Sequence, residues 1–391
     1  MVDFEPSRRV KKLPINFFDQ LDHRLAQSSK EGPAFINLSK GNPDLPTPKH
    51  IVDCLKVAAD HPENHAYTPF LGKENVRLAI AAFYKREYGV TLDPNEEISV
   101  FHGAHIGITG IPQALLNPGD YMLVTDPCYP IYYSSAVLSQ AKTYAMPIEA
   151  ANQFLPDYRC IPPAVLKKAR LLMVNYPNNP TGGLATADFY RKTIDFANRY
   201  HLPVINDFAY AALGFDHHKP LSILQTAGAK SVAVEVYTMS KTYNMAGWRF
   251  GFAVGNRSII KAFNHFHTQA YSTIFGAVQD AAACALQSSQ QCVADLVHTY
   301  QQRRDILING LRTIGWHVAP PAGTFFTWLR VPEGYDSQSF SDLLFRQAHI
   351  VVAPGIGFGR SGNFYIRISL VHSEAVLETA VQRIAALHLF K

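Results

Sequence analysis

The stretch TMSKTYNMAGWR, residues 238–249, is the part of this sequence that says most about its fold. Its lysine, Lys241, lies four positions after the end of Val232–Tyr237, an apolar run that is typical of a buried strand. By position alone, Lys241 would be a strand-end lysine whose ammonium group reaches water. A desolvated lysine has a lowered pKa, however, and its free amine can condense with an aldehyde cofactor. Both interpretations begin with a strand that ends just before this lysine.

Seven short apolar runs alternate with longer helical stretches from residue 98 onward. The runs are Ile98–Phe101, Tyr121–Thr125, Thr143–Ile148, Leu171–Val174, Val204–Asn206, Val232–Tyr237 and Phe250–Val254. This alternation predicts an α/β fold with a mainly parallel seven-stranded sheet that helices cover. Ligands of such sheets bind beyond the carboxyl ends of the strands, so the residues just after these runs are the first candidates for a site.

The rest of the chain predicts a smaller α+β unit and its connections. Helices are expected at 14–28, 49–60, 73–89, 337–348 and 373–388, strands at 316–318, 325–329, 350–352 and 365–369, and a long helical stretch at 258–314. Glycines and prolines between residues 40 and 48 favour an extended crossing between units. We therefore expect an N-terminal arm with part of the small domain over 1–47, a large domain over 48–290 and a C-terminal small domain over 291–391.

Composition and charge argue against several classes of protein. Hydrophobic residues make up 47% of the chain and charged residues 17%, which is the profile of a compact globular protein. Lysine and arginine outnumber aspartate and glutamate by only 36 to 31, so nucleic acid is not an expected partner. No apolar run approaches membrane-spanning length, and no signal-peptide pattern is found. We expect a soluble, cytoplasmic protein.

The cysteines and histidines indicate neither a disulfide framework nor a metal centre. The five cysteines are widely spaced, and they are Cys54, Cys128, Cys160, Cys284 and Cys292. Their odd number and the lack of a Cys-x-x-Cys pair predict free, buried thiols. Histidines pair at 102 and 105, 217 and 218, and 265 and 267, but no carboxylates accompany them at ligand spacing, so no metal site is expected.

The neighbours of Lys241 carry the first resemblance to a known family. The hydroxyls of Thr238 and Ser240 and the guanidinium of Arg249 would together form a good seat for a phosphate. With Lys241 they match Ser-x-[Ser/Ala]-Lys followed by a distant arginine, and here the chain resembles the class I and II aminotransferases of pyridoxal-phosphate fold type I. Thr238 stands where serine is commoner, but it keeps the hydroxyl. The resemblance implies that Lys241 carries pyridoxal 5′-phosphate in an αβα sandwich with a smaller α+β domain.

Two further motifs follow predicted strands. Asn179 lies in Asn-Pro-Thr-Gly, which resembles the family turn whose asparagine bonds the cofactor's phenolic oxygen and contributes to substrate binding; alone, it is simply a turn. Asp207 and Tyr210 have the family's Asp-x-x-Tyr spacing, which implies that Asp207 keeps the ring nitrogen protonated and that Tyr210 bonds the phenolic oxygen. A buried carboxylate after an apolar strand does call for a cation. The alternatives are a helix cap for Asp207 and a core aromatic for Tyr210.

Phosphate binding and ring stacking are implied at two more places. Gly103, Ala104 and His105 open a predicted helix, and the backbone N–H groups at its start would form a phosphate cradle. The family often has a small hydroxyl residue or lysine here, so the role of the His105 side chain is left open. Tyr129 matches the aromatic residue that stacks on the pyridine face, although a lone tyrosine would be interpreted as core.

Three residues are matched to substrate binding and to a partner subunit. Tyr67 resembles the tyrosine that reaches the phosphate of the neighbouring subunit, which implies a homodimer with shared active sites. Gly41 matches the glycine whose backbone approaches the substrate carboxylate, and Arg367 matches the arginine that grips it. Because Arg367 alternates with apolar neighbours on a predicted strand, a solvent-facing arginine is the alternative. The resemblance runs from about Ile36 to the C-terminus.

Taken together, the resemblance implies an aminotransferase of amino acid metabolism that works by a ping-pong mechanism. Its catalytic residues would be Lys241, Asp207 and Tyr210. No arginine occurs between residues 258 and 302, where dicarboxylate-specific relatives have one, so an uncharged or apolar substrate side chain is favoured. Residues 155–158, 240–249 and 387–391 look most like those of the methionine-salvage enzymes, which act on methionine and 4-methylthio-2-oxobutanoate.

Other functions were weighed against this one. Aspartate or aromatic amino acids are alternative substrates, and a pyridoxal-phosphate-dependent carbon–sulfur lyase would share the same lysine, aspartate and arginine. A nicotinamide-dependent dehydrogenase is disfavoured because no Gly-x-Gly-x-x-Gly follows the first predicted strand.

Overall fold

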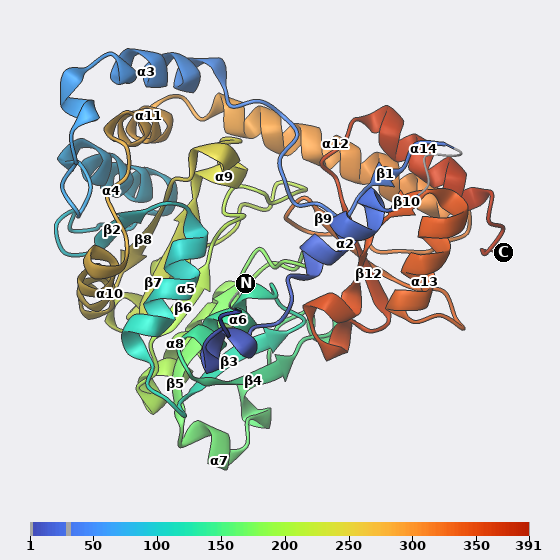
Figure 1. Cartoon of the computed structure of the whole chain (residues 1–391), viewed down its shortest axis with the longest axis horizontal. Coiled ribbons are helices and arrows are strands. Elements are labelled where there is room, and N and C mark those ends of the chain that lie inside the picture. Colours follow the sequence, from blue (N-terminus) through green and yellow to red (C-terminus); the bar gives the residue numbers. More distant parts are fainter. Residues whose placement is uncertain (1–2, 29–32, 391) are drawn as a thin grey trace.

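The fold is built on one seven-stranded sheet, seen in the computed structural model of residues 3–28 and 33–390 (Figure 1). The strand order is β2 (Ile98–Phe101), β8 (Gly251–Gly255), β7 (Ala233–Thr238), β6 (Val204–Asp207), β5 (Ala169–Asn175), β3 (Tyr121–Asp126) and β4 (Lys142–Pro147). All neighbouring strands pair in parallel except β8, which is antiparallel to both β2 and β7. The prediction of a mainly parallel seven-stranded sheet is confirmed.

Helices bury both faces of this sheet, and β5 shows how the sequence allows it. Leu172 and Val174 point into one hydrophobic core, whereas Leu171 and Met173 point into the other. Successive side chains of a strand point to opposite faces of the sheet. An uninterrupted apolar run therefore fits a sheet that helices cover on both faces. The covering helices are α3 (Lys49–Ala59), α4 (Glu74–Tyr88), α5 (Ala104–Leu115), α6 (Ile131–Leu138), α8 (Ala187–Tyr200), α10 (Arg257–Ala270) and α11 (Gly276–Gln287).

A second, smaller sheet lies beside the first (Figure 1). It is antiparallel, with the order β11 (Ala353–Pro354), β12 (Tyr365–Ser369) and β9 (Phe326–Arg330). Near it, β1 (Ile36–Asn37) pairs in parallel with β10 (Ile350–Val351), so a segment from the start of the chain joins the C-terminal part. Three helices complete this part, namely α12 (Gln291–Thr313), α13 (Ser337–Leu343) and α14 (Glu374–Ala385).

Several element boundaries differ from the predictions. Trp316–Val318 forms no strand; instead, the Trp316 indole donates to the Arg330 carbonyl at 3.0 Å and fills the core. The predicted helical stretch 258–314 is three helices, with breaks at 271–275 and 288–290. Helix α2 (Phe17–Ala26) begins after Pro14, because the Asn16 side chain caps it by accepting from the Phe18 N–H at 3.0 Å. Short helices occur at α1 (Arg8–Lys11), α7 (Pro163–Leu166) and α9 (Met239–Thr242).

The prediction that all five cysteines are free and buried is wrong. Cys54 of α3 and Cys284 of α11 form a disulfide bond, and Cys160 is exposed. The two bonded cysteines are 230 positions apart. They meet because α3 and α11 pack against each other, which the spacing of cysteines in a sequence does not reveal.

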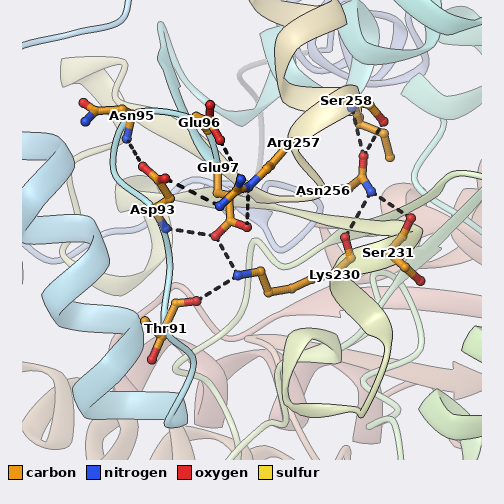
Figure 2. A network of polar contacts seen from close by, with 11 residues as sticks. Thr91, Asp93, Asn95, Glu96, Glu97, Lys230, Ser231, Asn256, Arg257 and Ser258 are labelled. Carbon is orange, nitrogen blue, oxygen red and sulfur yellow. Dashed lines mark hydrogen bonds and ion pairs between the residues drawn. The ribbon is translucent and has the colours of Figure 1, made fainter.

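Opposite charges pair closely at the amino edge of the large sheet (Figure 2). Glu97 precedes β2, Lys230 precedes β7, and Arg257 follows β8. The Glu97 carboxylate forms ion pairs with Lys230 Nζ at 2.6 Å and Arg257 Nε at 3.3 Å. It also accepts a hydrogen bond from the Asp93 N–H at 2.9 Å. This network, which we call the amino-edge network, joins the ends of three strands.

No helix within residues 3–28 and 33–390 combines the length and the apolar character that crossing a membrane would require.

Candidate active site

A cavity of about 520 Å³ lies at the carboxyl edge of the large sheet, with walls from both sheets. Most of the residues predicted from the sequence line it. They are Gly41, Ala104, His105, Tyr129, Asn179, Asp207, Tyr210, Thr238, Ser240, Lys241, Arg249 and Arg367. The strands β2, β3, β5, β6 and β7 all end at this edge, which is why residues far apart in the sequence meet here.

Two of the predicted residues do not line the cavity. Gly103 lies just behind it, at the start of α5, in the left-handed region with φ +83°. A Cβ at this position would lie 2.2 Å from Arg249 Nη2, so only glycine allows α5 to start this close to the arginine. Tyr67 does not line the cavity of its own chain and is 89% exposed.

Lys241 extends into the cavity from α9, the short helix that follows β7. Thr238 caps this helix by accepting from the Ser240 N–H at 3.2 Å. The Lys241 ammonium donates to the Gly41 carbonyl at 2.6 Å. Burial and, to a lesser extent, the charges of Arg367 and Arg249 together lower the pKa of Lys241 to about 7, against a smaller opposing effect of Asp207. A fraction of the amine is therefore neutral near physiological pH.

Asp207, at the end of β6, is a buried carboxylate with few groups around it that stabilise its negative charge. It accepts a hydrogen bond from the Tyr132 hydroxyl at 2.7 Å and a weaker one from the Ala209 N–H at 3.3 Å. Burial raises the pKa of Asp207 to about 6, although the Tyr132 bond opposes this rise. In the described part of the chain, no basic side chain lies within ion-pair distance of it. A cationic ligand group would complete this site.

Arg367 is buried on β12, so the alternative of a solvent-facing arginine is wrong. Its Nη1 donates to the Asn179 side-chain oxygen at 2.9 Å and its Nη2 donates to the Ser39 carbonyl at 2.7 Å. Burial lowers the pKa of Arg367 to about 10. Nε has no partner among the described residues. Two neutral acceptors leave the charge of this guanidinium unbalanced, which suits it to an anion.

Aromatic rings enclose the Arg367 guanidinium. Its central carbon lies 3.8 Å from the centre of the Phe326 ring, 4.7 Å from that of Phe358 and 5.2 Å from that of Phe18. Rings in these positions attract the cation and exclude water from it. Electrostatic attraction to a bound carboxylate is stronger in such surroundings than in water.

A third cation lies beside the start of α5. Arg249 is in the left-handed region with φ +55°, and its Nη1 donates to the Ala246 carbonyl at 2.8 Å. The Thr238 hydroxyl donates to the Ser240 hydroxyl at 2.9 Å, on the same side of the cavity. Burial and the Arg249 charge both lower the pKa of His105. The hydroxyls, the guanidinium and the first N–H groups of α5 together offer a seat for a phosphate.

Asn179 is positioned by another asparagine that sequence reasoning missed. The Asn175 side chain donates to the Asp207 carbonyl at 2.6 Å and accepts from the Asn179 N–H at 2.7 Å. It thus links the ends of β5 and β6, and it places Asn179 between Asp207 and Arg367. Asn175 ends an apolar run, which was the only available signal, and no motif pointed to it.

Further residues of the site were also missed. Tyr132 reaches Asp207 from α6, Phe326 comes from β9, and Phe18 and Asp22 come from α2. In the sequence each has the appearance of an ordinary helical or core residue. They become part of the site only through long-range packing, which local periodicity does not encode.

Comparison with known proteins gives consistent results. Residues 33–384 match the family model described as aminotransferase class I and II. The L-glutamine–4-(methylsulfanyl)-2-oxobutanoate aminotransferase of Bacillus subtilis (strain 168) is 50% identical over 99% of this chain and 97% of its own length. An LL-diaminopimelate aminotransferase of Syntrophobacter fumaroxidans is 42% identical over 98% of this chain and 99% of its own. The substrate-bound structure of BacF from Bacillus subtilis superposes with a TM-score of 0.95 at 44% identity, covering 100% of this chain and 99% of that one.

Proposed function

Because this chain belongs to the class I and II aminotransferases, we propose that its cavity binds pyridoxal 5′-phosphate and that Lys241 carries the cofactor. The enzyme moves an amino group between an amino acid and a 2-oxo acid. The observation that carries the cofactor proposal is a set of charges around one cavity that form no ion pair among the described residues, namely Lys241, Arg249, Arg367 and Asp207.

The residues present fit the chemical groups of this cofactor. Asp207 supplies the anion that a protonated ring nitrogen needs, and that nitrogen supplies the cation that Asp207 lacks. Arg249, with the Thr238 and Ser240 hydroxyls and the start of α5, suits the phosphate. Tyr129 suits the face of the ring. When bound, pyridoxal 5′-phosphate supplies an electron-poor ring that takes up the charge left when a proton leaves the substrate Cα.

We assign the proton transfer to Lys241. Its neutral amine can accept the proton from the substrate Cα and, as an ammonium group, would donate it again on the cofactor side of the substrate nitrogen, and a pKa of about 7 suits both transfers. Burial raises the pKa of Tyr210, so its hydroxyl stays protonated and can donate a hydrogen bond toward the reacting centre, as can the Asn179 amide. Arg367 binds the substrate carboxylate, and its fixed position orients the Cα–H bond toward the lysine.

For the substrate, we propose amino acids with uncharged side chains, including glutamine as donor and 4-(methylsulfanyl)-2-oxobutanoate as acceptor, as in the name of the relative from Bacillus subtilis. Phe18, Phe326 and Phe358 around Arg367 give the cavity an apolar wall. The absence of arginine between residues 258 and 302 supports the same proposal. Aspartate and aromatic amino acids are the alternative substrates.

We also propose a homodimer in which Tyr67 completes the partner's site. Tyr67, Phe70 and Phe275 are 89%, 52% and 47% exposed. They belong to one region, because the Thr68 hydroxyl donates to the Ile274 carbonyl at 3.1 Å. Mixing Lys241→Ala and Tyr67→Ala chains tests the shared site, since a mixed dimer would regain one site with both residues intact. No recovery of activity on mixing would contradict this proposal.

The cofactor assignment can be tested directly. Borohydride reduction of the purified enzyme followed by peptide mapping should place the cofactor on Lys241, and a label elsewhere or none at all would overturn the assignment. A matrix of amino donors and 2-oxo acid acceptors then gives the substrates. Product formed without any 2-oxo acid would indicate a carbon–sulfur lyase instead.

A further inference from the structure

We propose that Asp22 and Lys40 form a subsite that recognises a primary carboxamide at the end of the substrate side chain. This inference rests on the proposed function and names the residues that would select a glutamine-type donor. Both side chains line the cavity, and Lys40 Nζ lies 3.0 Å from Asp22 Oδ1. Their exposed fractions are 52% for Lys40 and 48% for Asp22, so ligands can reach the pair.

Helix α2 brings Asp22 to the cavity. Phe18 and Asp22 are four residues apart, so they lie on one face of this helix, and both line the cavity. The helix is held by Phe17, Phe18 and Leu21, which pack on Trp328 and Phe358. Figure 1 shows α2 next to β9 and β12, the strands that supply the aromatic and arginine side chains of the site.

The spacing along α2 fits the length of a substrate side chain. Phe18 lies over Arg367, which we assign to the substrate carboxylate, with 5.2 Å between ring centre and guanidinium carbon. Asp22 is one helical turn from Phe18, about 6 Å along the helix axis. An extended side chain of four bonds of about 1.5 Å each spans a similar length. The far end of such a side chain can therefore reach the pair while its carboxylate stays on Arg367.

Lys40 reaches Asp22 from the segment that precedes α3, a different part of the chain from α2. Its two sequence neighbours are part of the site, because the Ser39 carbonyl accepts from Arg367 and the Gly41 carbonyl accepts from Lys241. The backbone on each side of Lys40 is therefore fixed relative to the reacting groups.

The chemistry of the pair determines which group it recognises. Together, the two side chains offer one donor group, the Lys40 ammonium, and one acceptor group, the Asp22 carboxylate, and they carry no net charge. A primary carboxamide matches both, since its carbonyl can accept from Lys40 and its NH₂ can donate to Asp22. A terminal carboxylate would be repelled by the negative charge of Asp22, and a terminal ammonium would be repelled by the positive charge of Lys40. A thioether would leave the pair intact but form no hydrogen bond with it.

The test compares glutamine with methionine in wild-type enzyme and in Asp22→Leu and Lys40→Met variants, with one common 2-oxo acid acceptor. We expect the ratio of kcat/KM for glutamine to that for methionine to fall by roughly tenfold in each variant, which is the effect of about one charge-assisted hydrogen bond. Partial unfolding lowers both values equally and leaves their ratio unchanged. The matched control is Asp53→Asn, which removes one partner of the exposed Lys49–Asp53 ion pair on α3 and should not alter the ratio.

The two variants should also differ in whether they favour substrates with an anionic or a cationic side chain. Asp22→Leu leaves Lys40 unpaired and should raise the use of glutamate relative to methionine, whereas Lys40→Met leaves Asp22 unpaired and should raise the use of ornithine. A merely structural role of the pair would not produce opposite shifts. Ratios within twofold of wild type in both variants would overturn the subsite. A wild-type enzyme that transaminates no donor would instead overturn the proposed function.

Discussion

Both edges of the large sheet carry charged residues beside β2, β7 and β8, and the two edges differ in how these charges are balanced. At the amino edge, Glu97 is paired with Lys230 and Arg257 within the chain (Figure 2). At the carboxyl edge, Lys241 and Arg249 form no ion pair among the described residues. Charges that are already paired stabilise the fold and have little left to offer a ligand. Charges that form no ion pair within the protein remain available to a ligand of complementary charge, which stabilises the site when it binds.

The largest expected difference between the two edges is in turnover. Lys241→Ala removes the group that moves the proton, and we expect kcat to fall by at least about a thousandfold. The control is a lysine at the opposite edge, since Lys230→Ala should leave kcat close to that of wild type. Steady-state transamination with excess cofactor measures both. Near wild-type turnover of Lys241→Ala would refute the assignment of the catalytic lysine.

Arg367→Leu should give the next largest effect. The substitution removes charge-assisted hydrogen bonds to the substrate carboxylate, worth about 1.5 to 3 kcal/mol, so we expect kcat/KM to fall roughly ten- to a hundredfold. An amine donor without a carboxylate should lose far less activity. Equal losses for both kinds of donor would show that Arg367 acts on the fold and not on the substrate.

The lowered pKa of Lys241 predicts that the rate of cofactor uptake depends on pH. Only the neutral amine can react with the cofactor aldehyde, and it becomes protonated as the pH falls through a pKa of about 7. Between pH 8 and pH 6, the neutral fraction, and with it the rate at which cofactor-free enzyme takes up the cofactor, should fall about tenfold. Stopped-flow absorbance measures this rate. A rate that stays constant over this range would contradict the low pKa.

The smallest effect is expected at the amino-edge network, and there it concerns stability. Glu97→Gln keeps the shape of the side chain but weakens its bonds to Lys230 and Arg257, so the free energy of unfolding should fall by about 1 kcal/mol. Thermal unfolding, followed by circular dichroism, measures the loss. A large loss of kcat/KM without any loss of stability would mean that the two edges are not functionally separate.

The parts of the molecule that the sequence predicts well are those with a strong local signal. The seven strands can be predicted because each is an apolar run bounded by helical stretches, and Lys241 is a candidate because it lies just after one of them. Arg367 was matched through a family resemblance, since its strand alone equally allowed a solvent-facing side chain. The αβα arrangement follows from the alternation of strand and helix.

Features that depend on distant contacts could not be predicted in this way. Tyr132 and Asp207 are 75 positions apart, and the two bonded cysteines are 230 apart. Trp316–Val318 has the composition of a strand, but its tryptophan finds its partner in the Arg330 carbonyl and packs into a core instead. Asp22 lies on an amphipathic helix whose polar face would ordinarily be solvated. In each case tertiary packing, rather than local preference, decides the outcome.

The two hydrogen bonds that hold Arg367 have a consequence for the thermodynamics of substrate binding. A free arginine side chain carries about 2 kcal/mol of rotamer entropy, and here Asn179 and Ser39 remove most of that freedom during folding. A substrate carboxylate therefore meets a guanidinium that needs no reordering. In calorimetry, Asn179→Ala should make the entropy of binding less favourable, because part of the ordering would then be deferred until the substrate arrives.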